Sequence, residues 1–166
     1  MRLNSLRYFN VAGVLSTGEI GEDHDPVTHL IPIVLQAAFG QREVITIFDD
    51  NYNTSDGTCI RDYVHVEDLI EAHILSLEYL NTHSKSQIFN YTGYSVKEIV
   101  EASRKVTGKE IPAKIGERRA GYPVKLVAVS EKARSILGEQ LAYETIDDII
   151  QTAWKRHEDN PETYTQ

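Results

Sequence analysis

Three arginines lie where a phosphate group could be held. Arg61 interrupts the strand-like run TCIRDYVHVEDL, and Arg118 and Arg119 lie together in GERRAGYP, a loop bounded by glycine and proline. A guanidinium group offers a planar fork of donors that matches a phosphate or a carboxylate. Two such sites close to loops are compatible with a diphosphate ligand. The alternative for Arg61 is a structural ion pair with Asp62 or with a carboxylate of the following helix.

Other positions are candidates for ligand contact. His29 and Leu30 begin the apolar, helix-like run LIPIVLQAAFG, and the free amides and dipole of a helix N-terminus favour an anion. Asn10 follows an apolar strand-like segment, and ligands of open α/β sheets lie at the carboxyl ends of strands; an ordinary turn residue is the alternative. His24 and His29 are separated by a proline in a loop, a weak spacing for metal ligands, so we expect no metal site.

The sequence lacks the motifs of several common active sites. No G-x-G-x-x-G turn follows a strand, so no dinucleotide site is visible, and there is no G-x-S-x-G elbow. A Tyr-x-x-x-Lys pair is absent as well, because Tyr94 and Lys97, like Tyr122 and Lys125, are spaced one residue too closely. The lone Cys59 is more typical of a strand residue than of a nucleophile, because nothing near it in the sequence marks it as activated.

The elements that would position these residues alternate between strands and helices. Apolar spacing predicts strands at 6–10, 43–48, 58–65 and 86–91, and helices at 30–39, 66–80, 96–106 and 146–157. Thr28 is the expected N-cap of the first helix, Ser95 and Glu98 form a capping box for the third, and Thr145 caps the last. A short helix capped by Ser130 precedes the last one. This alternation indicates an α/β fold.

Bulk composition narrows the class of protein. The 166 residues, 41% hydrophobic and 25% charged, are ordinary for one globular domain. The net charge of −8 argues against a nucleic-acid partner, because proteins that bind the phosphate backbone are usually basic. No apolar run is long enough to cross a bilayer. A single cysteine excludes an internal disulfide and fits a reducing compartment, so we expect a cytoplasmic location.

Six segments, taken in order, resemble the UDP-glucose 4-epimerases, a group of extended short-chain dehydrogenases/reductases. They are SLRYFNVAG, GEDHDPVTHLIP, IFDDNYNTSDGTCIRDYVHVEDL, GYSVKEIVEASRKVTG, GERRAGYPVKLVAVSEKAR and the final helix with Trp154. The long insert between Phe48 and Arg61 is the most specific of them, because related dehydratases and decarboxylases usually have a short loop there. The match covers essentially the whole chain but corresponds only to the C-terminal half of such an enzyme.

The resemblance implies part of a Rossmann-type sheet plus a small α/β subdomain. It assigns residues 1–166 to the C-terminal substrate-binding region and places the N-terminal dinucleotide-binding half outside the chain. The family reaction interconverts UDP-galactose and UDP-glucose with tightly held NAD, and the catalytic Tyr-x-x-x-Lys pair belongs to the N-terminal half. We therefore expect no catalytic residue here and no activity from the chain alone. The expected partners are a UDP-sugar and a separate N-terminal half, and the family is usually homodimeric.

The resemblance also assigns roles to residues of this chain. Arg61 and Arg119 match arginines that bind the diphosphate, and Asn10 matches a substrate asparagine beside a cofactor-contacting phenylalanine, here Phe9. The other matching substrate positions are the helix start His29 and Leu30, the nucleoside segment Thr46, Ile47 and Phe48, the sugar-framing Leu126, and Tyr122. Tyr122 departs from the family, which usually has an acid there that helps to bind the substrate.

Three interpretations remain open. The chain is a fragment or split half of a UDP-glucose 4-epimerase, a non-catalytic UDP-sugar-binding module, or part of another NAD-dependent sugar-nucleotide enzyme such as a decarboxylase or dehydratase. The insert counts against the third, and the loop near Asn90 is shorter than in the epimerases. Under the first interpretation, the strand at 6–10 lies beside the strand at 88–91 but lacks its other neighbour, which leaves an apolar edge and one sheet face exposed.

Overall fold

The computed structural model describes residues 3–23, 26–83, 87–89, 93–127 and 135–161, and of residues 87–89 only the backbone. The elements in chain order are β1 (Asn4–Leu6), β2 (Val11–Ala12), α1 (Leu30–Ala38), β3 (Ile45–Phe48), β4 (Ile60–Asp62), β5 (Val64–His65), α2 (Val66–Thr82), β6 (Gln87–Phe89), β7 (Gly93–Ser95), α3 (Val96–Thr107), β8 (Ala113–Gly116), β9 (Lys125–Leu126) and α5 (Ile146–Asp159). Helices alternate with short, mostly parallel strand pairs, which confirms the α/β class.

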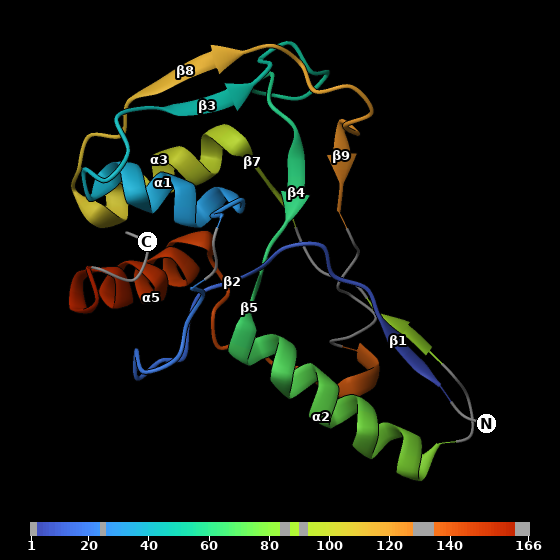
Figure 1. Cartoon of the computed structure of the whole chain (residues 1–166). Coiled ribbons are helices and arrows are strands. Elements are labelled where there is room, and N and C mark those ends of the chain that lie inside the picture. Colours follow the sequence, from blue (N-terminus) through green and yellow to red (C-terminus); the bar gives the residue numbers. More distant parts are fainter. Residues whose placement is uncertain (1–2, 24–25, 84–86, 90–92, 128–134, 162–166) are drawn as a thin grey trace.

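Three helices and one strand pair form the larger packed region. α1, α3 and α5 lie together beneath the parallel pair β3–β8 (Figure 1). Val34, Ile99 and Ile150, one from each helix, are completely buried at its centre. The predicted apolar side of α5 also packs here, because Ile149 and Trp154 are buried in the same cluster. This region therefore has a hydrophobic core of its own.

A central strand runs from the packed region to the rest of the chain. β4 pairs antiparallel with β7 and parallel with β9, whereas β5 pairs with β2 (Figure 1). The single strand predicted at 58–65 is thus interrupted at Tyr63, because the segment changes pairing partners there. This path places Arg61 and His65 on one short stretch of chain that links two parts of the molecule.

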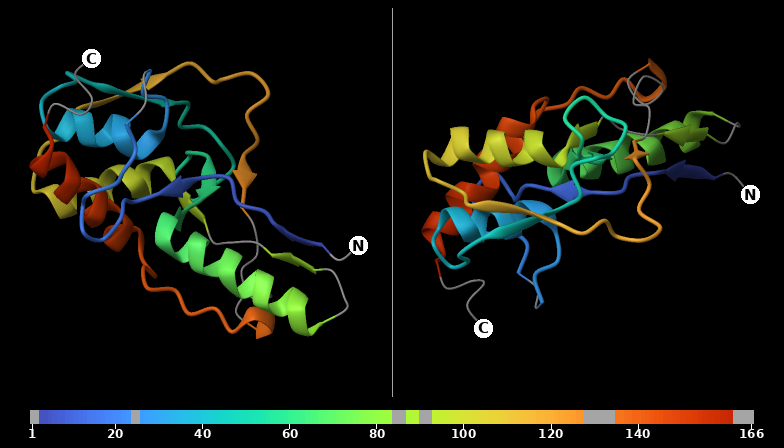
Figure 2. Two further views of the ribbon diagram at one scale, coloured as in Figure 1. Left: turned by 60° about the horizontal axis from the view of Figure 1, so that its bottom comes forward. Right: turned by 90° about the horizontal axis from the view of Figure 1, so that it is seen from above.

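The smaller region consists of α2 and the parallel pair β1–β6 (Figure 2). The strand predicted at 6–10 is wrong in extent: β1 ends at Leu6 and β2 begins only at Val11. The chain turns between two different partners here, since β1 pairs with β6 and β2 with β5. The expected pairing with the segment around Ile88 does form, with Ser5 opposite Ile88.

Helix N-termini agree with the sequence in two cases out of three. Ser95 and Thr145 cap α3 and α5 through capping boxes with Glu98 and Asp148. The prediction of Thr28 as the cap of α1 is wrong, because His29 takes the N-cap position and its side chain makes no capping hydrogen bond. The cap expected at residue 130, the loop at residue 90 and the strand end at residue 91 lie outside the described residues.

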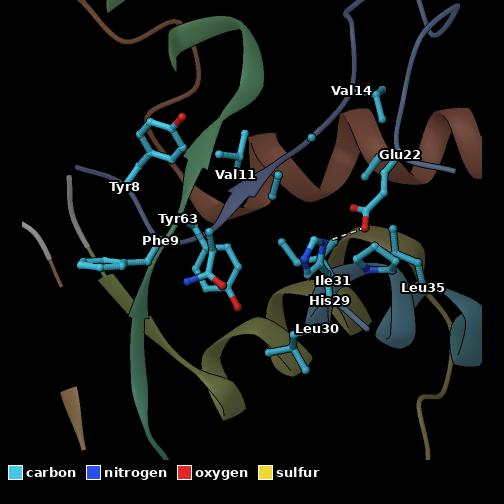
Figure 3. Close-up of a pocket in the computed structure, with 15 residues that line it drawn as sticks. Tyr8, Phe9, Val11, Val14, Glu22, His29, Leu30, Ile31, Leu35 and Tyr63 are labelled. Atoms are coloured by element: carbon cyan, nitrogen blue, oxygen red, sulfur yellow. Dashed lines mark hydrogen bonds and ion pairs between the residues drawn. The ribbon is translucent and has the colours of Figure 1, made fainter. Parts of the chain in front are cut away.

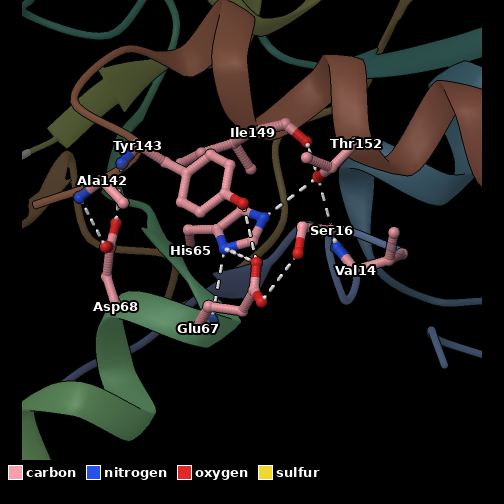
Figure 4. Close-up of polar contacts among 9 residues, drawn as sticks. All are labelled: Val14, Ser16, His65, Glu67, Asp68, Ala142, Tyr143, Ile149 and Thr152. Atoms are coloured by element: carbon pink, nitrogen blue, oxygen red, sulfur yellow. Dashed lines mark hydrogen bonds and ion pairs between the residues drawn. The ribbon is translucent and has the colours of Figure 1, made fainter. Parts of the chain in front are cut away.

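The start of α2 is joined to α5 by a buried histidine (Figure 4). His65 Nδ1 accepts a hydrogen bond from the Glu67 amide at 3.2 Å, and its Nε2 donates to Thr152 Oγ1 at 3.0 Å. The imidazole is fully buried and stacks on the Tyr143 ring, with the ring centroids 3.5 Å apart. Burial lowers the pKa of His65, although Asp68 and Glu67 act in the opposite direction.

The long insert is fastened to the start of α3. Ser95 Oγ donates a hydrogen bond to Asp56 Oδ2, and Lys97 Nζ donates to the Asp56 carbonyl at 2.8 Å. Asp56 Oδ1 also accepts from the amide and the hydroxyl of the fully buried Thr58, each at 2.8 Å. Burial raises the pKa of Asp56, but the hydrogen bonds from Ser95 and Thr58 outweigh it and lower the pKa overall.

The tip of the insert is closely packed as well. Gly57 has a φ of +82°, and a Cβ atom there would lie 1.9 Å from the Asp50 carbonyl oxygen, so only glycine fits. Tyr52 in the same loop is 4% exposed. The insert is therefore a fixed part of the fold that leads directly into β4.

Candidate functional site

A cavity of about 220 Å³ opens between the start of α1 and the segment that joins β1 to β2 (Figure 3). Four expected site residues line it, namely Phe9, Asn10, His29 and Leu30. They come from two segments of the chain, residues 9–10 and 29–30, and in the close-up Tyr63 lies between Phe9 on one side and His29 and Leu30 on the other. The structure thus brings together the positions assigned to the sugar, the cofactor and the helix start.

Asn10 is held by the central strand. Its side-chain amide donates to the Asp62 carbonyl at 3.0 Å and lies 3.4 Å from Asp62 Oδ1, while its own carbonyl accepts from the Val64 amide. Asp62 is almost completely buried, and this burial raises its pKa against the hydrogen bond from Asn10. Asn10 is therefore positioned by the strand segment that also carries Arg61.

The start of α1 forms part of the cavity wall. His29 occupies the N-cap with an extended backbone, and its Nδ1 lies 2.8 Å from Glu22 Oε1. Leu30 follows as the first helical residue and packs partly against the core. The first turn of this helix contains no acidic residue, but the Glu22 carboxylate that contacts His29 lines the same cavity.

A second group of expected residues gathers beside β4. The guanidinium carbon of Arg119 lies 3.6 Å from the centroid of the Phe48 ring and 5.5 Å from that of Tyr122. The guanidinium carbon of Arg61 lies 5.2 Å from the Tyr122 centroid. Leu126 is the parallel-strand partner of Arg61. Two cationic and two aromatic side chains thus share one surface.

Neither guanidinium group of this cluster is neutralised within the described part of the chain. Arg61 Nη1 donates to the Ile60 carbonyl at 2.7 Å, and its buried Nη2 has no hydrogen-bond partner. The alternative of a structural ion pair between Arg61 and Asp62 is not found among the described residues. The side chain of Arg119 donates a hydrogen bond to the Tyr122 hydroxyl at 3.3 Å, and no ion pair of Arg119 is found among the described residues. Unpaired guanidinium donors are suited to an anionic ligand.

The two adjacent loop arginines have different surroundings. Arg118 Nε lies 3.3 Å from Asp49 Oδ2, and its guanidinium covers the Tyr52 ring at 4.0 Å. Arg118 therefore pins the 113–127 segment to the insert, whereas Arg119 turns toward Phe48.

The three expected nucleoside residues on β3 do not point the same way. Ile47 is 6% exposed and belongs to the buried side of the strand, Thr46 is half-buried, and Phe48 is 37% exposed. This follows from the alternation of side chains along a strand. Phe48 contacts Arg119 through its side chain, whereas the buried side chain of Ile47 points away, so Ile47 can contribute only its backbone at that surface.

Tyr63 is the main site residue that the sequence did not single out. It lines the cavity, lies two positions beyond Arg61, and is 8% exposed. Burial raises the pKa of its phenol. Its separation of two residues from Arg61 was the signal in the sequence that could have identified Tyr63, because residues two apart on an extended segment face the same side. Tyr8, 40% exposed at the mouth of the cavity, was missed as well.

The described residues contain no cluster of three or more His, Cys, Asp or Glu side chains suited to a metal ion. His24 and Asp25, the partners considered for His29, lie outside the described part. No helix within the described ranges is long and apolar enough to cross a membrane.

Residues 1–91 match the family described as "NAD dependent epimerase/dehydratase family". This match covers more than half of the chain. The chain belongs to that family.

Curated relatives within the family share extensive identity with the chain. The UDP-glucose 4-epimerase of Lacticaseibacillus casei is 55% identical over 99% of this chain and 50% of its own length. The enzyme of the same name from Halalkalibacterium halodurans is 52% identical over 96% of this chain and 49% of its own length. The chain thus spans about half the length of the curated relatives it matches.

Solved structures of the family agree in fold. A crystal structure of a UDP-glucose 4-epimerase superimposes with a TM-score of 0.87 at 54% identity, over 97% of this chain and 50% of that one. The Bifidobacterium longum enzyme, solved with NAD+ and UDP, superimposes with a TM-score of 0.86 at 33% identity, over 98% of this chain and 49% of that one. In each solved chain, about half of the length has no counterpart in this chain.

Proposed function

We propose that residues 1–166 form the UDP-sugar-binding part of a cytoplasmic UDP-glucose 4-epimerase, which interconverts UDP-galactose and UDP-glucose. The observation that carries the proposal is the arrangement along β4. This strand places Arg61 in the arginine–aromatic cluster, while its continuation places Tyr63 on the cavity beside Asn10. The identity of 55% to a curated epimerase supports the same reaction.

The two groups of residues divide the ligand between them. In this proposal, Arg61 and Arg119 bind the diphosphate, and Phe48 packs against the nucleoside beside the Thr46–Ile47 backbone. The sugar extends toward Leu126 and the cavity, where the side-chain oxygen of Asn10 accepts a hydrogen bond from a sugar hydroxyl, because the side-chain nitrogen of Asn10 already donates to Asp62. The amides at His29 and Leu30 add positive potential at the cavity wall.

NAD is the cofactor with which several solved family members were crystallised. The described residues of this chain do not fit a dinucleotide. Side chains of His65, Ser95 and Thr145 already cap α2, α3 and α5, and no glycine-rich turn leads from a strand into α1. We propose Phe9 as a contact to the cofactor and assign the dinucleotide cradle and the catalytic groups to a second half.

The smaller region provides a surface for that second half. Ile70, Ile74 and Leu77 follow one another along α2 and are 55%, 46% and 64% exposed. Among the described strands, β1 pairs only with β6 and β2 only with β5, which leaves backbone groups at their outer edges open to further strands. An apolar helix face beside open strand edges fits a partner that completes the sheet and covers the helix.

Calorimetric titration of the chain with UDP tests the binding role. Arg61→Ala should weaken UDP binding by about 2–5 kcal/mol, because it removes a partly buried charged contact to phosphate. Arg42→Ala is the matched control, since Arg42 is exposed and makes only long contacts to Gln36. Arg104 is unsuitable as a control because it bonds to Glu101 and to the Ile111 carbonyl. Equal affinity of wild type and Arg61→Ala would refute the assigned pocket.

A coupled turnover assay tests the reaction. The chain alone should not convert UDP-galactose, whereas a mixture with the separately produced N-terminal half of the Lacticaseibacillus casei relative should. Turnover by the chain alone, in a preparation free of host epimerase, would overturn the division into two halves. Binding of UDP without turnover in the mixture would favour a binding module.

A further inference from the structure

The His65 ring lies against a backbone segment that lines two hollows of the structure. Gly13 and Val14 belong to the wall of the cavity of about 220 Å³ and also to that of a neighbouring, more apolar groove of about 440 Å³ beside Ile70 of α2. Gly13 has a φ of +79°, and a Cβ atom there would lie 2.2 Å from Cδ2 of the imidazole. Only glycine fits at this contact, so the position of the ring and the course of the segment depend on each other.

The hydrogen bonds around His65 fix the ring nitrogen that carries its proton (Figure 4). Nδ1 accepts from the Glu67 amide at 3.2 Å, so the proton of the neutral ring lies on Nε2. Nε2 donates to Thr152 Oγ1 at 3.0 Å, and the same oxygen accepts from the Val14 amide at 3.3 Å. The Thr152 hydroxyl donates its own proton to the Ile149 carbonyl at 2.9 Å. The neutral imidazole thus joins the cap of α2, helix α5 and Val14 in one chain of hydrogen bonds.

Acidic groups and phenols face the imidazole from the elements around it. Glu67 Oε2, in the first turn of α2, lies 4.0 Å from His65 Nδ1. It accepts from the Tyr143 hydroxyl at 2.7 Å, and the other Glu67 oxygen accepts from the Ser16 hydroxyl at 3.2 Å. From α5 the ring meets Thr152, which carries no charge. The titratable residues that line the small space beside the ring are Tyr63, Asp68, Tyr94, Tyr143 and Glu144.

A second proton would reverse the role of Nδ1. The imidazolium ion donates from both ring nitrogens, so it cannot accept the Glu67 amide hydrogen. The Glu67 carboxylate is the acceptor for the new donor, but a separation of 4.0 Å exceeds hydrogen-bond distance. To close that gap, the ring or the first turn of α2 has to move, and either movement breaks the cap and loosens the contact with Gly13. The protonated ring therefore fits a different arrangement from the neutral one.

We propose that His65 is a proton-sensitive latch. In its neutral form it fastens the 13–16 segment and the start of α2 to α5, and its protonation releases both before the rest of the chain unfolds. The core of α1, α3 and α5 is separate from the cluster of Val64, Leu69 and Ala72 beneath α2, so the smaller cluster can loosen while the larger one persists. The proposal goes beyond the function given above and does not depend on it, because it concerns contacts within the chain.

The direction of the response follows from the burial of the ring. Burial lowers the pKa of His65 from 6.5, against the opposite influence of Asp68 and Glu67. The released form therefore takes up a proton more readily than the latched form. The latch is complete above pH 6.5 and weakens as the pH falls below that value.

NMR spectroscopy of the isotope-labelled full chain between pH 7.5 and pH 5.5 tests the latch. At pH 7.5 the ring-nitrogen chemical shifts of His65 should show a proton on Nε2 and none on Nδ1. The protection factors of the Val14 and Glu67 amides against hydrogen exchange should fall by up to about tenfold per pH unit below pH 6.5. At every pH both amides should be less protected than the amide of Val100, which is buried within α3.

Three variants identify the group that causes the response. His65→Gln should lose most of the change in protection, because glutamine does not titrate. His157→Gln is the matched control, since it removes another buried histidine and should leave the response of the Val14 amide in place. Glu67→Gln should move that response to lower pH, because the protonated ring then lacks its negative partner.

Several results would overturn the proposal. A proton on Nδ1, or a charged ring, at pH 7.5 would refute the latch. Equal protection of the Val14, Glu67 and Val100 amides at every pH would refute it too, because the segment would then open only when the whole chain unfolds. An unchanged response in His65→Gln, or its loss in His157→Gln, would show that another group is responsible. If His65→Gln does not fold, Glu67→Gln decides: a response at lower pH supports the latch, and a response at the wild-type pH refutes it.

Discussion

The two ends of the molecule show the same kind of helix in opposite situations. α5 and α2 are both amphipathic, yet Ile150 on α5 is completely buried whereas Ile74 on α2 is 46% exposed. α5 packs against α1 and α3 within the chain. α2 buries one side on Val64 and Leu6 and leaves the side of Ile74 to solvent. An amphipathic pattern therefore does not show that the apolar face of a helix is covered within the same chain.

The candidate site lies between the packed region that contains α5 and the smaller region that contains α2. β4, with Arg61, is paired on both sides by β7 and β9, while β2, next to Asn10, has a single neighbour among the described strands. The arginine cluster should therefore be well formed in the chain alone. The cavity beside Asn10 should be completed only when the open side is covered.

The same substitution in the two helices should produce the largest contrast. Ile150→Ala should lower the free energy of unfolding by about 2–5 kcal/mol, because it leaves a cavity in a packed core. Ile74→Ala should change it by less than about 0.5 kcal/mol, because the side chain is exposed and far from other features. Urea denaturation followed by circular dichroism measures both.

The exposed position should matter in the presence of the partner. Ile74→Ala should weaken association with the N-terminal half in the turnover mixture while Arg42→Ala does not. If Ile74→Ala alone destabilises the chain as much as Ile150→Ala does, the α2 face is already covered, and the contrast between the two regions fails.

Removal of a helix cap in the packed region should have a smaller effect on stability. Ser95→Ala removes the hydrogen bond that Ser95 Oγ accepts from the Glu98 amide and the one that it donates to Asp56, and should lower the free energy of unfolding by about 1–2 kcal/mol. Thr145→Ala removes only an exposed capping box and should cost about 1 kcal/mol or less. Urea midpoints rank the two. A Ser95→Ala chain as stable as wild type would show that the insert is held independently of α3.

Acid should destabilise the chain gradually through two buried histidines. Burial lowers the pKa of His65 and of His157 from 6.5, so the unfolded chain takes up protons first as the pH falls below that value. Their contribution to stability is thus complete above pH 6.5 and declines below it, by at most about 1.4 kcal/mol per pH unit for each histidine.

Urea denaturation at pH 7.5, 6.5 and 5.5 follows this decline. A chain carrying His65→Gln and His157→Gln should lose less stability over the same interval, because glutamine does not titrate. Stability that rises from pH 6.5 to pH 5.5 in the wild type would contradict the prediction.

Local signals in the sequence predicted the helices well and the strands less well. The capping box at Ser95, the cap at Thr145 and the hydrophobic periodicity of α5 depend on residues a few positions apart, and all three predictions match the structure. The strand expected at 6–10 failed because its limits depend on pairing with segments more than fifty residues away. The same dependence explains the interruption at Tyr63, where one chain segment passes between two sheets.

The candidate site shows the same difference between local features, which the sequence predicts, and long-range features, which it does not. Sequence spacing and resemblance named arginines and aromatic residues that the structure gathers in two groups. They could not show that the side chain of Ile47 points into the core, or that the Tyr122 ring lies close to both guanidinium groups. Such features depend on side-chain direction and on contacts between distant segments.

The insert that precedes β4 has the composition of a loop that accepts change freely, with Asp, Asn, Ser and Gly in succession. Its structure restricts that freedom. Gly57 admits no side chain, Thr58 is completely buried, and Asp56 is shared between a capping serine and a lysine. In a library of random variants this segment should therefore tolerate few substitutions, and its sequence should diverge more slowly among descendants than its turn-rich composition suggests.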